Sequence, residues 1–115
     1  MANESNARLQ NLSKLYGSEL VNEICLIFLE STDEQIHTLE KSLKNRDLSG
    51  VQFAGHKMKS SGVNLGLERF AELCEYFENI NEETPAPESV HNLRELRNEY
   101  EKAKRILRGY LEAAS

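Results

Sequence analysis

His56, Lys59 and Ser60 combine residue types and a spacing that could support phosphoryl chemistry. Residues three and four apart are neighbours on a helix, so Lys59 and Ser60 would lie one turn after His56. An exposed imidazole is largely uncharged at neutral pH and can act as a nucleophile, and lysine can pair with a phosphoryl oxygen as a point charge. The small residue at position 60 leaves room for a partner to reach the ring. An inert, solvated histidine is the alternative, and helix geometry alone does not decide between the two.

Other side chains share this outer helix surface, namely Gln52, Phe53, Lys57 and Val63. Phe53 and Val63 are apolar where solvated residues are expected, so each either contacts a partner protein or is covered by an N-terminal helix. Gln52 either hydrogen-bonds a partner's backbone or is simply solvated. Lys57 lies about 100° round the helix from His56, so we expect it to contribute less than Lys59.

The opposite face of the same helix carries apolar and small residues: Val51, Ala54, Gly55, Met58 and Gly62. At about 100° per residue these positions fall on one side, which predicts that this side faces a core. Gly55 and Gly62 each lower helix stability by roughly 1 kcal/mol relative to alanine. Because they lie on the same side, they indicate close approach of a neighbouring helix. Gly66 is expected to end this helix in the left-handed conformation.

Helical periodicity also runs through the rest of the chain, and β-strand alternation is nearly absent. The expected helices span residues 5–16, 19–30, 33–45, 48–64, 67–80 and 88–113. Ser18 and Asp47 are expected N-caps. Residues 32–35 resemble a capping box, which would separate the second helix from the third. The alternative is that these two segments form one longer helix with a bend. Residues 81–88 contain both prolines and are the clearest loop.

These elements predict an all-α protein, an antiparallel four-helix bundle over residues 18–113 with an additional N-terminal cover helix over residues 5–16. We expect residues 1–115 to form a single domain, since 115 residues leave little room for a second one. The two cysteines, Cys25 and Cys74, lie among apolar residues at helical spacing and are expected to be reduced core thiols.

The overall charge and the apolar runs exclude several classes of partner. The net charge of −5 argues against nucleic acid as a partner, because no general positive field exists to displace counterions. The longest wholly apolar run has six residues, 24–29, whereas a membrane span needs about twenty. The sequence shows no signal peptide, so we expect a soluble, cytoplasmic protein. His37 and His91 lack companions at metal-ligand spacing, so no metal site is expected. The acidic residues Glu72, Glu75, Glu78, Glu82 and Glu83 are interpreted as a solvated face and loop.

The run from His56 to Gly66, HKMKSSGVNLG, resembles the signature of histidine-containing phosphotransfer (Hpt) domains of bacterial phosphorelays. That signature has the histidine, an aliphatic residue, a lysine, small residues, and a glycine ten positions after the histidine. Ser60 is the one departure, since the family usually has glycine there. Residues 18–43 and 67–77 resemble the family's helices before and after this motif.

The resemblance implies a relay in which the His56 ring accepts a phosphoryl group from a receiver-domain aspartate, or donates one to it, through Nε2. Lys59 would neutralise phosphoryl charge. Partner contacts would come from Gln52, Phe53, Lys57, Ser60 and Val63, and the structural glycines would be Gly55, Gly62 and Gly66. The expected partners are response-regulator receiver domains and a hybrid sensor histidine kinase, with Mg²⁺ on the receiver and no cofactor of the chain's own.

Other sequence features bear on catalysis and assembly. No glycine-rich ATP loop is present, so we expect a monomeric phosphotransfer intermediary without kinase activity of its own. Two alternatives remain open from the sequence. One is a non-phosphorylated helical adaptor that binds a receiver or kinase domain, which the Ser60 departure keeps in play. The other is an unrelated bundle that uses His56 as a general base, although no orienting third group is visible.

Overall fold

A computed structural model describes the backbone of residues 4–114 and the side chains of residues 7–113. The ends of the predicted 1–115 domain, residues 1–3 and 115, lie outside the described residues. Five helices follow one another within residues 4–114: α1 (Glu4–Tyr16), α2 (Ser18–Lys44), α3 (Leu48–Asn64), α4 (Glu68–Glu78) and α5 (Ala86–Ala114). This part of the chain contains no strand, and the predicted all-α class is confirmed. None of the helices it describes is both long and apolar enough to cross a membrane.

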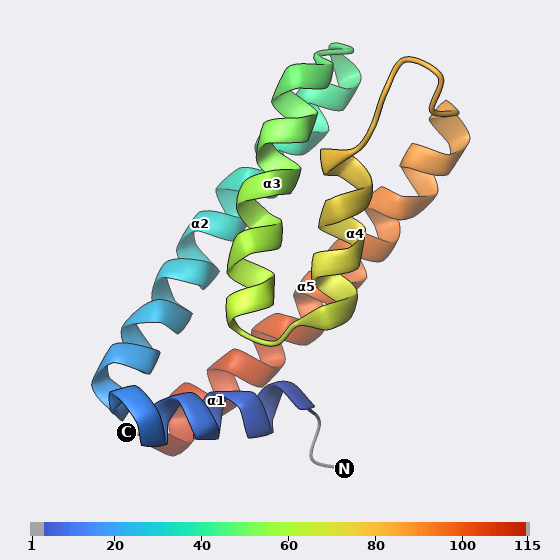
Figure 1. Ribbon diagram of the computed structural model, residues 1–115. Helices are drawn as coiled ribbons and strands as arrows, with labels where there is room; N and C mark the ends of the chain where they lie inside the picture. The colour runs from blue at the N-terminus through green and yellow to red at the C-terminus, as the bar shows by residue number, and fades with distance from the viewer. Residues whose placement is uncertain (1–3, 115) are drawn as a thin grey trace.

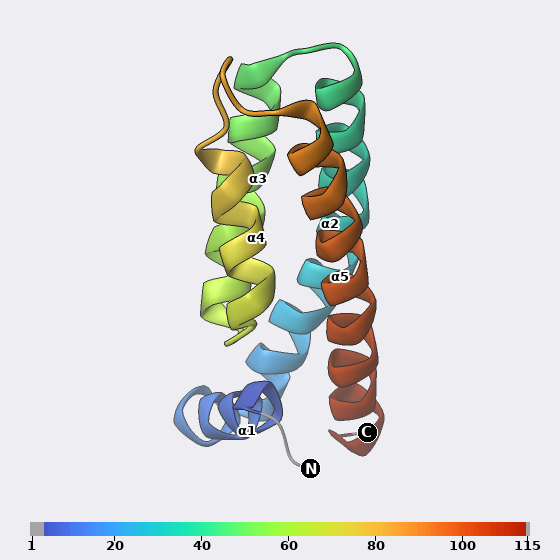
Figure 2. The ribbon, with the colours of Figure 1, turned by 90° about the vertical axis from the view of Figure 1, so that its right-hand side faces the viewer.

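Helices α2 to α5 form the predicted antiparallel bundle (Figure 1). Each packs on two others: α3 contacts α2 and α4, and α5 also contacts α2 and α4. Helix α5 has 29 residues, and its length of about 44 Å at 1.5 Å per residue matches the 44 Å long axis of the protein. The shorter α3 and α4 extend only part-way along α2 and α5, so one end of the bundle, where α3 ends and α4 begins, is formed by α2 and α5 alone (Figure 2). Helix α1 lies across that end and packs on α2 and α5.

Helix α2 is continuous, so the predicted division near residues 31–33 is wrong. Its buried positions keep one helical phase through the expected break: Val21, Cys25, Phe28, Thr32, Ile36, Leu39 and Ser42. Thr32, the expected cap, is only 1% exposed. Packing of this one face against the bundle outweighs the local capping pattern, because most helix stability in proteins comes from tertiary contacts. Ser18 is the first residue of α2, and the N-cap is Gly17 at φ 91°.

The ends of α3 agree with the sequence prediction. Asp47 caps the helix by accepting a hydrogen bond from the Gly50 backbone N–H at 3.1 Å. Gly66 has φ 73°, the left-handed conformation that was expected after the helix. Helix α4 is shorter than predicted, since it begins after Leu67 and ends at Glu78. Helix α5 begins at Ala86, earlier than predicted, so Pro87 lies in its first turn. A proline is tolerated there, because backbone N–H groups in the first turn have no partner within the helix.

The core joins all the helices and includes both cysteines. The Phe28 ring meets the edges of Phe70 and Tyr100 at centroid distances of 5.5 and 6.1 Å, which links α2, α4 and α5. Cys25 and Cys74 are free and buried, as predicted. Burial raises the pKa of the Cys25 thiol to about 11 and raises that of Cys74 as well. Both are therefore neutral, unreactive thiols near pH 7.

Gly55 and Gly62 allow α4 to pack closely on α3, as predicted. A Cβ atom at Gly55 would lie 2.7 Å from the backbone N of Glu78 and 2.8 Å from the carbonyl O of Cys74. At Gly62 it would lie 2.9 Å from Cδ2 of the buried Phe70 ring. The contact at Gly55 is therefore between backbones, which cannot move aside as a flexible side chain can.

Replacing Gly55 with alanine is expected to lower the free energy of unfolding by about 1–3 kcal/mol, because the added methyl collides with the α4 backbone. Gly109→Ala is the matched control. Gly109 lies in α5, where a Cβ meets nothing within 4 Å, so alanine there should raise stability by up to about 1 kcal/mol through helix propensity. Urea denaturation of both variants measures the difference, and equal effects would contradict the close-contact explanation.

Candidate functional site

The outer face of α3 presents the histidine to solvent. The His56 side chain is 64% exposed, and Phe53 and Val63 are 62% and 55% exposed. The five residues predicted for the core face of this helix are all buried. The structure therefore places both faces of α3 as the periodicity predicted. Helix α1 does not cover Phe53, so that alternative for Phe53 is excluded.

Glu78, the last residue of α4, forms a hydrogen bond with Nδ1 of His56. An ionised carboxylate can only accept hydrogen bonds, so Nδ1 carries the proton of the neutral ring. The lone pair is then on Nε2, the nitrogen on the far side of the ring. Glu78 thus orients the imidazole and leaves Nε2 as a nucleophile.

Lys59 lies beside the same carboxylate. Its Nζ is 3.0 Å from Oε1 of Glu78 and 3.4 Å from Oε1 of Glu75. The hydrogen bond to Glu78 is the main reason that the pKa of Lys59 is raised. Hydrogen bonds from His56 and then Lys59 lower the pKa of Glu78. Lys59 is therefore a firmly charged ammonium and Glu78 a firmly charged carboxylate near pH 7.

The packing at Gly55 explains how Glu78 reaches His56. Because Gly55 lets the end of α4 touch α3, the backbone of Glu78 lies against the turn of α3 that carries the histidine. Glu75 lies one turn earlier on α4, so it shares the same side of that helix. A bulkier residue at position 55 would move both carboxylates away from His56 and Lys59.

A model of the family described as the Hpt domain matches residues 23–106 of the chain. The chain belongs to the Hpt family. No curated protein and no solved structure matches it. The match covers α3 and α4 completely, so the matched part of this Hpt domain includes His56, Glu75 and Glu78.

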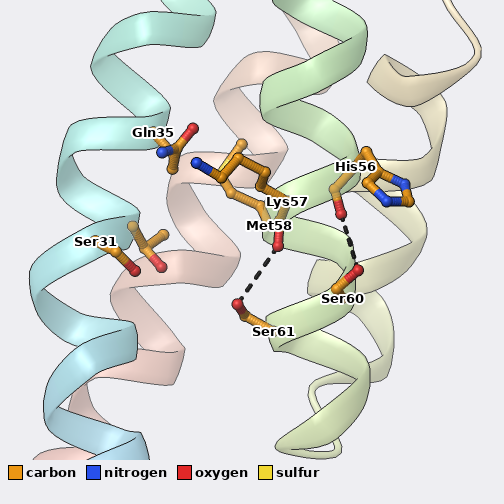
Figure 3. A pocket seen from close by; sticks show the side chains of 8 residues that line it. Ser31, Gln35, His56, Lys57, Met58, Ser60 and Ser61 are labelled. Atoms are coloured by element: carbon orange, nitrogen blue, oxygen red, sulfur yellow. Dashed lines mark hydrogen bonds between the residues drawn. The ribbon is translucent and has the colours of Figure 1, made fainter.

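The two serines after the histidine turn their hydroxyls towards the backbone of α3 (Figure 3). Ser60 Oγ donates to the His56 carbonyl at 3.2 Å, and Ser61 Oγ donates to the Lys57 carbonyl at 3.4 Å. Ser60, where the family usually has glycine, therefore has its hydroxyl occupied within the helix. The Ser60 hydroxyl therefore presents no second nucleophile to the ring.

A groove runs between α2 and α3 beside this site of the Hpt domain. Its walls are formed by Ser31, Thr32, Gln35, His56, Lys57, Met58, Ser60 and Ser61. In Figure 3, Ser31 and Gln35 form the α2 wall, and the His56 ring points away from α2. Lys57 Nζ lies 5.1 Å from the centroid of the Phe53 ring. Lys57 is thus engaged with an aromatic ring, whereas Lys59 lies beside the histidine.

Gln52 has a contact within the chain that the sequence did not predict. Its Nε2 donates to the Ile80 carbonyl at 2.7 Å, which ties α3 to the segment just after α4. The half-buried Gln52 therefore supports the same α3–α4 arrangement that holds Glu78.

The carboxylates Glu75 and Glu78 are the functional candidates that the sequence analysis missed, since it assigned them to a solvated acidic face. They stand at an i, i+3 spacing beside the core residues Cys74 and Phe77. That spacing shows that they share a side of α4, but only the register between α3 and α4 brings them to His56.

Helix α2 carries an exposed apolar stripe that was not predicted from the sequence, formed by Leu20, Ile24 and Ile27. These residues recur at intervals of four and three, so they lie along one side of the helix. The same side continues through Ser31 and Gln35 into the groove beside His56. The stripe and the exposed Val63 therefore add apolar surface to the helices that carry and border His56.

The remaining histidines lie apart from this site. His37 is exposed, and His91 Nε2 lies 3.7 Å from Glu95 on its own helix. Within the residues that the structure describes, no group of three or more His, Cys, Asp or Glu side chains is placed to hold a metal ion.

Replacing Glu78 with alanine is expected to change the tautomer of His56, because the acceptor at Nδ1 is lost. In the wild type, ¹⁵N NMR above the titration range of imidazole should show a protonated Nδ1 and an unprotonated Nε2. In the variant both resonances should move towards those of the exposed His37 in the same spectrum. Glu75→Ala is the matched control, since Glu75 pairs with Lys59 and should leave the ring unchanged. Identical His56 resonances in the wild type and Glu78→Ala would contradict the assignment.

Proposed function

We propose that this Hpt domain relays a phosphoryl group between receiver-domain aspartates through His56. The observation that carries the proposal is the hydrogen bond from Nδ1 to Glu78, which leaves an exposed Nε2 with its lone pair free. That lone pair attacks the phosphorus of an aspartyl phosphate. An N–P bond forms, the P–O bond to the aspartate breaks, and the aspartate leaves as a carboxylate.

The charges around His56 suit such a transfer. As Nε2 donates its lone pair, the ring gains positive charge, and the Glu78 carboxylate beside Nδ1 stabilises it. Phosphoryl transfer proceeds through a loose, in-line transition state that depends on positioning and charge neutralisation. Lys59 supplies a positive charge one turn from the ring. The receiver would supply the aspartate and Mg²⁺.

The domain would act as an intermediary and not as a kinase. Gly55 and Gly62 lie inside α3 against α4, so they are packing residues and not a phosphate-binding loop. We infer that the phosphoryl group arrives from the receiver domain of a hybrid sensor histidine kinase and leaves to a response regulator. Such a relay would operate in the cytoplasm.

We infer that a receiver domain docks over the apolar surface that borders His56. The α2 stripe of Leu20, Ile24 and Ile27 leads into the groove whose wall includes His56. The His56 ring points away from α2 (Figure 3), but an interface of about 800 Å² on each partner is wide enough to cover both the ring and the stripe. Phe53 and Val63 extend this surface along α3 before and after the histidine. Covering it with a receiver is compatible with a monomeric Hpt domain.

Transfer from a receiver domain phosphorylated by a small phosphodonor in the presence of Mg²⁺ tests the relay. Label should move to the wild type, where it should be acid-labile and base-stable, and should not move to His56→Gln. Lys59→Ala should slow transfer at least about tenfold, because a charge facing the phosphoryl oxygens is lost. Lys102→Ala is the matched control and should remain close to the wild-type rate, since Lys102 lies on α5 and pairs with Glu99 of the same helix.

The same experiment separates the relay from the adaptor alternative. Receivers that bind the wild type but never transfer label to it would favour a non-phosphorylated adaptor. Label on a residue other than His56 would also overturn the assignment.

Replacing Ile27 with aspartate tests the docking surface. We expect about a tenfold weaker affinity for the receiver in isothermal titration calorimetry, because a charge would enter an apolar contact. Leu26→Asp is the matched control, since Leu26 is 50% exposed against 55% for Ile27 but lies about 100° further round the helix. Equal losses in both variants would contradict docking along the stripe.

A further inference from the structure

Lys59 is shared between two carboxylates while His56 is unphosphorylated. Glu78 has a second contact, the Nδ1 of His56, whereas among the described residues Lys59 is the cation paired with Glu75. The neighbouring α2 residues in the groove, Ser31 and Gln35, are uncharged. With a neutral imidazole, the ammonium and the two carboxylates leave one net negative charge on the Nδ1 side of the ring. Lys57, the other cation of the groove, lies over the Phe53 ring.

Phosphorylation of Nε2 would change this balance. A phosphoryl group adds about two negative charges near neutral pH. As the Lys59 ammonium moves towards the phosphoryl oxygens, its longer contact, the 3.4 Å pair with Glu75, is weakened before the 3.0 Å pair with Glu78. Glu78 also keeps its hydrogen bond with the positively charged ring, whereas Glu75 loses the cation that it pairs with among the described residues. The cost of holding the phosphoryl group is therefore concentrated at Glu75.

We propose that Glu75 sets the equilibrium of phosphotransfer and biases this Hpt domain towards donating its phosphoryl group. The inference rests on the proposed relay through His56. Glu75 competes for Lys59 and repels the phosphoryl group, so it destabilises phospho-His56 relative to the phosphoaspartate of a receiver. Glu75 acts as a positioning residue, because it contacts Lys59 and does not contact the ring.

The test is the partition of label at equilibrium between His56 and a receiver aspartate. Glu75→Gln keeps the size of the side chain and one acceptor oxygen but removes its charge. We expect it to shift the equilibrium towards phospho-His56 by about two- to fivefold, the range for a partly exposed charge pair. The shift should shrink in high salt, which screens charges and would not reverse a change in packing.

Glu72→Gln is the matched control. Glu72 lies one turn earlier on α4, loses the same charge on substitution, and pairs with Arg69 at 3.4 Å instead of Lys59. Its equilibrium should stay near that of the wild type. In a Lys59→Ala background, the part of the Glu75→Gln equilibrium shift that comes from competition for Lys59 should disappear.

The outcomes separate this inference from the relay itself. If the wild type becomes phosphorylated on His56 and Glu75→Gln partitions like the wild type or like Glu72→Gln, the role of Glu75 is overturned and the relay stands. If the wild type never carries phosphate on His56, both fail together. A salt-independent shift in Glu75→Gln would also overturn the electrostatic role.

Discussion

The distance between the backbones of α3 and α4 at Gly55 governs the chemistry of this protein. A side chain of any size at that position would meet the Glu78 nitrogen and the Cys74 carbonyl, both of which belong to a regular helix. Protein interiors are packed densely enough that such a conflict moves whole elements. The fold and the site therefore depend on the same contact, since the atoms that close the core also carry the carboxylate to the imidazole.

The result is a compact set of interacting charges on an otherwise solvated surface. Glu78 binds His56 with one carboxylate oxygen and Lys59 with the other, so the orientation of the nucleophile and the position of the cation are coupled. Hydrogen bonds between charged groups are stronger and more directional than neutral ones. A single carboxylate can thus order two side chains that would otherwise sample many rotamers in water.

The properties of α3 alone could be predicted from the sequence. Burial of Met58 and exposure of His56 follow from the periodicity of one helix, and the cap at Asp47 and the left-handed Gly66 follow from local backbone chemistry. The role of Glu78 could not be predicted in this way, because it depends on how far α4 is displaced along α3. Gly55 indicated that two helices touch, but not which residues they bring together.

Helix α2 shows two other limits of local patterns. Residues 32–35 have the types of a capping box, yet Thr32 is buried and the helix continues, since its core-facing residues keep their phase. The exposure of Ile24 and Ile27 could not be predicted from the sequence either, because they belong to its longest apolar run. Helix α3 ends part-way along α2, so the N-terminal end of α2 extends beyond it (Figure 2).

With a receiver docked as proposed, the overhang of α2 beyond α3 would separate the surface for recognition from the site of chemistry. Leu20, Ile24 and Ile27 are all exposed, so substitutions there remove little core packing, and surface changes usually alter stability by no more than about 0.5 kcal/mol. Gly55, Glu78 and His56 have no such freedom, because each is fixed by the others. Under the proposed function, lineages of this protein could exchange one partner for another by altering a single exposed helical side, while inheriting His56 and its carboxylates unchanged.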